Sequence, residues 1–80
     1  MKIINIGFNN SVMLDKIVAV STSEAAPMKR LREEARRQGR LLDVTSGRKT
    51  RSVIITDSNH VILSGIEPET LAERIRKERI

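Results

Sequence analysis

The sequence contains no cysteine and only one histidine among its 80 residues. The lack of cysteine excludes disulfides and thiolate zinc sites, and a single histidine excludes a histidine-rich metal site within one subunit. Aromatic residues are nearly absent too, since Phe8 is the only one. We therefore expect a single domain, residues 1–80, with an aliphatic core and no cofactor or metal.

Long hydrophobic runs are also missing. No stretch of about 18 apolar residues is present to span a bilayer. The apolar start is interrupted by Asn5 and Gly7, which leaves it too short for the core of a signal peptide. We therefore expect a soluble, cytoplasmic protein.

Positive charge is the clearest compositional bias. Fifteen Lys and Arg residues against ten Asp and Glu give a formal net charge of +5 and a pI near 10.5. This balance favours an anionic partner, either nucleic acid or a membrane surface.

Hydrophobic patterning predicts an α+β fold with a mainly antiparallel sheet of about five strands and two helices. The first helix is expected to begin near Ser23, with Ser21 and Glu24 as a capping box, and to end at Gly39. The second is expected to open at Pro68. The predicted strands are residues 2–6, 12–21, 41–45, 51–56 and 60–64.

Two of the predicted strands are apolar on both faces. Residues 53–55 read Val-Ile-Ile and residues 61–63 read Val-Ile-Leu, with no alternation. Such runs are typical of a sheet that is covered on both sides. Two short helices can cover one side only, so we infer that another subunit covers the rest, or an edge, of the sheet, which predicts a homo-oligomer. The alternative is that twisting and helix placement hide both faces within one chain.

The excess charge lies in the middle of the chain, on the first helix and on the loop that follows the third strand. On the helix, acidic residues at i,i+4 spacing accompany the cations, which indicates an ordinary solvated surface. The loop carries Arg48, Lys49 and Arg51, with no acidic neighbour closer than Asp43. Guanidinium, hydroxyl and backbone N–H groups together form a good phosphate grip, although a solvated hairpin tip is the alternative.

Other classes of function find little support. Asp57 and His60 bracket a predicted turn, which explains Asp57 without acid–base chemistry, and no phosphate-binding glycine motif is present, so an enzyme with a small-molecule substrate is not expected. The apolar stripe of the first helix is too thin for membrane binding. Single-stranded RNA is usually held by aromatic stacking, and Phe8 is expected in the core. Double-stranded DNA, gripped by its phosphates, is therefore the favoured partner.

Five segments, in order along nearly the whole chain, resemble the RemA family of bacterial extracellular matrix regulatory proteins. They are residues 5–8 (NIGF), 23–30 (SEAAPMKR), 47–55 (GRKTRSVII), 56–64 (TDSNHVILS) and 68–70 (PET).

The resemblance implies a LytTR-like fold and a ring-shaped homo-oligomer of about seven or eight subunits. It also implies a DNA-binding transcription regulator of biofilm matrix genes, with a basic rim along which DNA bends. The family's DNA contacts fall on Lys16, Arg48 and Lys49 of this chain. Two of the three are Lys here, which keeps the charge but loses the bidentate fork of Arg. Arg51 is expected either to contact DNA or to lie at a subunit interface.

Two further hypotheses remain beside this one. The chain could form a structural or adaptor oligomer whose basic loop binds acidic protein partners. It could also be a small RNA-binding module. Salt dependence and direct competition between duplexes, RNA and proteins discriminate among the three.

Overall fold

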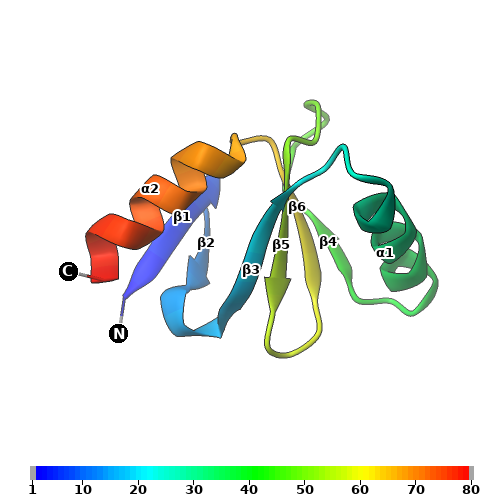
Figure 1. Cartoon of the computed structure of the whole chain (residues 1–80), viewed down its shortest axis with the longest axis horizontal. Coiled ribbons are helices and arrows are strands. Elements are labelled where there is room, and N and C mark those ends of the chain that lie inside the picture. Colours follow the sequence, from blue (N-terminus) through cyan, green and yellow to red (C-terminus); the bar gives the residue numbers. More distant parts are fainter. Residues whose placement is uncertain (1, 80) are drawn as a thin grey trace.

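The structure, a computed structural model, describes residues 2–79 and contains six strands and two α-helices (Figure 1). A two-stranded hairpin, β1–β2, precedes a four-stranded sheet of order β3-β5-β6-β4, in which only β4 and β6 are parallel. The prediction of an α+β fold with a mainly antiparallel sheet is confirmed, but six strands in two sheets replace the five expected. The elements are β1 Ile3–Gly7, β2 Asn10–Met13, β3 Ile17–Thr22, α1 Ala26–Arg37, β4 Leu41–Asp43, β5 Ser52–Thr56, β6 Val61–Ser64 and α2 Pro68–Arg79.

The extra strand arises because the single strand predicted over residues 12–21 is wrong. A short 3-10 helix, Leu14–Lys16, divides it into β2, which pairs with β1, and β3, which pairs with β5. The Leu14 side chain is buried, and the backbone N–H of Leu14 donates to the Lys2 carbonyl oxygen at 3.0 Å. Burial of Leu14 thus turns the chain from the hairpin into the larger sheet.

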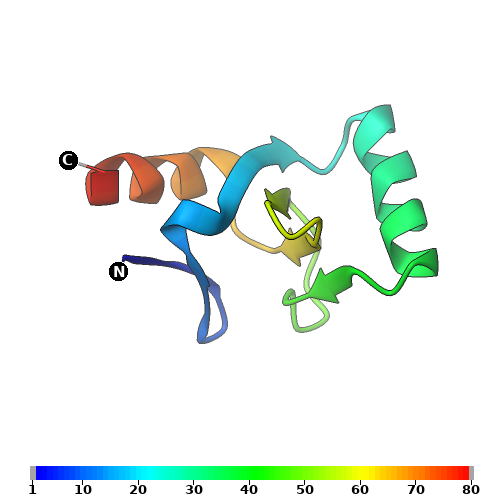
Figure 2. The same cartoon turned by 90° about the horizontal axis from the view of Figure 1, so that it is seen from below.

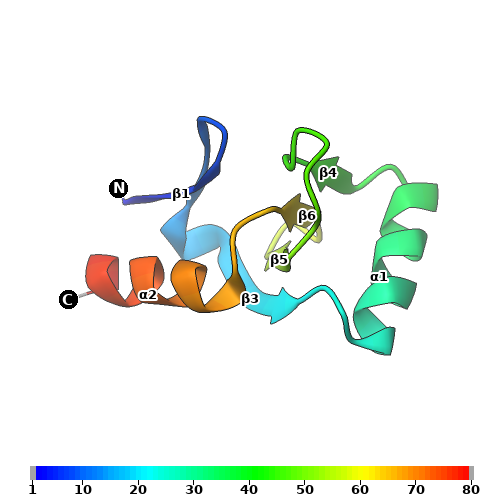
Figure 3. The same cartoon turned by 90° about the horizontal axis from the view of Figure 1, so that it is seen from above.

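Both faces of the central strands are covered within one chain, with α1 on one side of the sheet and α2 and the hairpin on the other, as the views from below and from above show (Figures 2 and 3). Val53 and Leu63 pack with Ala35 of α1, whereas Ile54 and Ile62 pack in a second cluster with Leu71 of α2. The hairpin contributes its buried Ile residues to that second cluster. Of the two alternatives for the faces of the sheet, the one in which a single chain hides both is confirmed, because the hairpin and α2 together cover the face that α1 leaves open.

The ends of the helices follow the sequence only in part. Gly39 adopts φ +72° just beyond the end of α1, as predicted, and Pro27 lies in the first turn of that helix, where proline is tolerated. The predicted capping box is wrong, since the N-cap is Ala25 without a side-chain hydrogen bond. Ser23 is buried instead, and its hydroxyl donates to the Thr50 carbonyl oxygen at 2.9 Å. Pro68 begins α2, as predicted.

Within residues 2–79, no helix has the length and apolar character needed to cross a membrane.

Candidate nucleic-acid interface

The basic loop between β4 and β5 is built on a tight turn. The Asp43 Oδ1 atom accepts hydrogen bonds from the Thr45 N–H at 2.9 Å and from the Thr45 hydroxyl at 2.7 Å, and Thr45 is buried. The Arg48 N–H then donates to the Thr45 carbonyl oxygen at 3.1 Å. The two central residues, Ser46 and Gly47, have φ values of +53° and +81°, as a type I′ turn requires. The turn exposes the following Arg48 and Lys49 to solvent.

Hydrogen bonds and nearby positive charges favour the ionised form of the Asp43 carboxylate under this turn. The hydrogen bonds from Thr45 are the main cause that lowers the pKa of Asp43 below its ordinary value, and the positive charges of Arg36 and Arg32 on α1 lower it further. The same attraction links the basic surface of α1 to the base of the loop. Asp43 therefore acts as a charged anchor of the turn at neutral pH.

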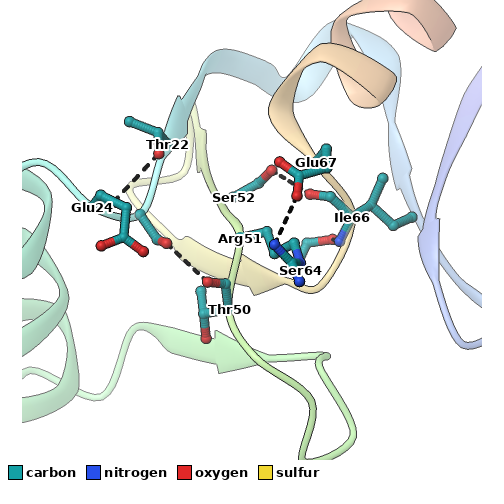
Figure 4. A network of polar contacts seen from close by, with 9 residues as sticks. Thr22, Glu24, Thr50, Arg51, Ser52, Ser64, Ile66 and Glu67 are labelled. Carbon is teal, nitrogen blue, oxygen red and sulfur yellow. Dashed lines mark hydrogen bonds and ion pairs between the residues drawn. The ribbon is translucent and has the colours of Figure 1, made fainter.

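The returning arm of the loop is fixed to two neighbouring segments, the connection between β3 and α1 and the end of β6 (Figure 4). The Thr50 carbonyl oxygen accepts from the Ser23 hydroxyl, and the Arg51 carbonyl oxygen accepts from the Ser23 N–H at 3.2 Å. The Arg51 N–H donates to the Ser64 carbonyl oxygen at 2.9 Å. The loop is thus held at both ends, and only its tip projects.

The four predicted contact residues differ in how their charges are engaged. Arg51 Nη1 lies 2.9 Å from Glu67 Oε1, at the start of α2 (Figure 4), and Lys16 Nζ lies 3.8 Å from Asp57 Oδ2. Among the residues that the structure describes, neither Arg48 nor Lys49 takes part in an ion pair or a side-chain hydrogen bond. Of the four predicted residues, Arg48 and Lys49 are therefore the two whose side chains are not engaged by an acidic group of the described chain.

Position separates the same residues into two groups. Arg48, Lys49 and Arg51 lie together before β5, whereas Lys16 contacts Asp57 directly after it. The register pairs Ile17 with Thr56, so Lys16, which directly precedes β3, lies at the opposite end of β5 from the basic loop. Figure 1 shows the start of β3 beside the end of β5. Five residues of strand correspond to roughly 17 Å. A single chain therefore brings three of the predicted residues together and holds Lys16 apart from them.

Phe8 is a part of this surface that was placed wrongly from the sequence, where it was expected in the core. Its side chain is 48% exposed at the tip of the β1–β2 hairpin, and the guanidinium carbon of Arg48 lies 4.9 Å from the centre of its ring. The hairpin tip and the basic loop project on the same side of the molecule (Figures 2 and 3). A signal was available, because Gly7 and Asn9 flank Phe8 with turn chemistry and turns lie at the surface.

The turn that contains His60 has no acid–base pair. The Asp57 carboxylate lies near Lys16 Nζ, whereas His60 Nδ1 lies 2.8 Å from the Ser58 hydroxyl. The backbone N–H of His60 donates to the Thr56 hydroxyl at 3.1 Å. These contacts of Thr56, Ser58 and His60 close the β5–β6 hairpin, so the turn is structural as predicted, but the expected cap by Asp57 is wrong because its carboxylate faces Lys16.

Comparison with known proteins gives a consistent family. Residues 3–75 match the family described as RemA-like, Extracellular matrix regulatory protein A-like. A relative from Nitratidesulfovibrio vulgaris (strain DP4) is 57% identical over 77 residues, covering 96% of this chain and 90% of its own length. A relative from Pseudothermotoga lettingae is 53% identical, with 98% and 86% covered, and one from Thermotoga maritima is 57% identical, with 90% and 78% covered. All three are named "Putative regulatory protein".

Proposed function

The chain belongs to the RemA-like family, and from this premise we propose that it is a DNA-binding transcription regulator. In this proposal it acts as a ring-shaped homo-oligomer of about seven or eight subunits on extracellular matrix genes. Its partner is double-stranded DNA, and it has no catalytic role and needs no cofactor. The regulatory names of the relatives support the general class.

The observation that carries the proposal is the pair of free cations on an anchored turn. Arg48 and Lys49 are exposed, adjacent and without an acidic partner among the described residues, and hydrogen bonds that Thr45 donates to Asp43 hold the turn in place. Such a group satisfies the main need of a phosphate contact, which is an uncompensated positive charge at a fixed position. Lys16 and Arg51 contribute less, because each first has to leave a carboxylate.

Assembly supplies the affinity that one subunit lacks. Two to four phosphate contacts are too few for firm binding at physiological salt, whereas a ring repeats them and joins them through avidity. Exposed apolar side chains lie on both edge strands of the larger sheet, Val18 on β3 and Leu42 on β4. Two different edges suit a head-to-tail contact, which closes into a ring when the rotation allows.

The proposal is tested by the salt dependence of binding to duplexes of unrelated sequence, measured by fluorescence anisotropy. The logarithm of the affinity is expected to fall steeply with the logarithm of salt concentration, by roughly 0.9 for each phosphate engaged. Lys49→Ala is expected to weaken binding about equally on every duplex and to flatten this slope. Lys77→Ala removes the same charge from an exposed position of α2 and serves as the matched control.

Two results would count against this function. One is an affinity that does not respond to salt. The other is an equal loss for the Lys49→Ala and Lys77→Ala variants, which would mean that net charge alone matters. If the protein captured proteins but no duplex, the acidic-partner adaptor would replace the DNA regulator.

A further inference from the structure

The only aromatic residue of the chain is held exposed in an unfavourable backbone conformation. Phe8 has φ +50°, a region that bulky residues seldom adopt, and its side chain is 48% exposed. The turn is fixed by side-chain amides. Asn5 Oδ1 accepts from the Gly7 N–H at 2.9 Å, and Asn10 Nδ2 donates to the carbonyl oxygens of Gly7 and Phe8 at 3.0 and 3.1 Å. Burial does not explain this placement, because the ring faces a loop and solvent.

The partner of the ring is Arg48. Its guanidinium carbon lies over the ring at 4.9 Å from the centre, within the range of a cation–π interaction. A contact with a π face does not use the N–H groups of the guanidinium, whereas the ion pair between Arg51 and Glu67 occupies donors of Arg51. Arg48 is thus restrained while its five N–H donors stay available for an anion.

We propose that Phe8 is a positioning residue that orients the Arg48 guanidinium for phosphate contact. The proposal rests on the DNA-binding function above and adds to it a second element, the β1–β2 hairpin, which touches DNA only through Arg48. Restraining a long side chain before binding removes part of the entropy that association would otherwise cost. The ring thereby makes one cation of the loop more effective than its neighbour Lys49.

A double-mutant cycle on duplex binding tests this coupling. Phe8→Leu keeps an apolar side chain of similar bulk in the turn but removes the π face, and we expect it to weaken binding about two- to five-fold for each engaged subunit. Phe8→Trp keeps a π face and is expected to restore near-native binding. In an Arg48→Ala background, Phe8→Leu is expected to have no further effect, because the side chain that it positions is gone.

Additive losses of duplex affinity in the two single variants would overturn the proposal. If Phe8→Leu and Arg48→Ala lose affinity independently, Phe8 either stacks directly on a base or supports the hairpin alone. If the wild-type protein binds no duplex, both the proposed function and this inference are wrong. If it binds duplex but the two losses are additive, only this inference is wrong.

NMR of the free protein supplies a readout that does not depend on DNA. The side-chain protons of Arg48 are expected to be shifted upfield by the ring of Phe8 and to move to ordinary values in Phe8→Leu. Arg51 serves as the internal control, and its resonances are expected to stay in place. Ordinary Arg48 shifts in the wild type would overturn the positioning role, whatever the result with DNA.

Discussion

Arg48 and Arg51 carry the same side chain three residues apart, but their surroundings give the two guanidinium groups different roles. Arg51 is bound to Glu67, and this exposed ion pair ties the start of β5 to the start of α2. Such surface pairs contribute about 0–1 kcal/mol to folding, so Glu67 mainly neutralises a charge of the basic loop. Arg48 has a neutral ring as its neighbour and keeps its full charge.

The neutralising role of Glu67 leads to a residue-scale prediction. Glu67→Gln is expected to raise the affinity for duplex DNA about two- to five-fold per engaged subunit, because it frees Arg51 and removes a negative charge from the loop. Glu69→Gln removes the same charge two residues further on, in the first turn of α2, from a residue without an ion pair in the described chain, and is expected to change affinity less. Titration of a labelled duplex at fixed salt measures both, and equal gains would contradict the local explanation.

At this scale the sequence predicted which charges lie on the loop, but not which of them are compensated. The spacing of Arg48, Lys49 and Arg51 after Gly47 correctly predicted a basic loop between strands. The pairing of Arg51 with Glu67 joins residues 16 positions apart, and that of Lys16 with Asp57 joins residues 41 apart. Only the folded arrangement of β3, β5 and α2 brings these partners together, so local spacing could not reveal them.

Among the elements, the turn over residues 45–48 depends most on a single ionised group. Asp43 accepts two hydrogen bonds from buried Thr45, and these hydrogen bonds, helped by Arg36 and Arg32, hold its pKa below the ordinary value. A carboxyl whose pKa is depressed by folding stabilises the folded state above its unfolded pKa, near 3.9. That stability is lost as the pH falls through the lowered pKa of the folded state.

The corresponding prediction concerns acid unfolding. The wild type is expected to lose stability as the pH falls below about 4, and part of this loss comes from protonation of Asp43. Asp43→Asn keeps an oxygen that can accept from Thr45 but cannot titrate, so we expect a shallower decline in the free energy of unfolding. Urea unfolding between pH 3 and 7, in steps of about one unit, measures the difference.

Asp15→Asn is the matched control for this series. It removes a carboxylate that makes no side-chain hydrogen bond or ion pair in the part of the chain described, and it should leave the slope nearly as in the wild type. Identical pH profiles for the wild type and Asp43→Asn would show that the carboxylate does not anchor the turn.

The limits of sequence patterning are clearest in the segment after the first turn. Residues 12–21 are rich in β-forming side chains, and the pair Asp15-Lys16 is too short an interruption to indicate a break. The break follows from tertiary packing, because Leu14 enters the core and the strand that follows joins a different sheet. Likewise, serine is a residue type that often caps helices, but the hydroxyl of Ser23 donates instead to the carbonyl oxygen of Thr50, which is distant in the sequence.

At the scale of the whole molecule, the faces of the sheet form the core, whereas the proposed assembly uses its edges. Apolar side chains on both faces of β5 and β6 correctly predicted a doubly covered sheet, but α1 covers one face and the hairpin with α2 covers the other. The return of a hairpin onto a sheet is a non-local event that periodicity does not encode. Oligomerisation in our proposal therefore rests on the exposed edge strands and on the need to repeat a small number of phosphate contacts.

The central claim is that copies of this chain assemble and present their free loop cations as a repeated surface for duplex DNA. Size-exclusion chromatography with light scattering, run with and without a duplex of a few helical turns, tests it most directly. We expect a mass of about seven or eight times the 9.0 kDa of one chain, and a larger complex when duplex is added. A 9.0 kDa monomer at high protein concentration that leaves the duplex unshifted in dilute buffer would contradict it.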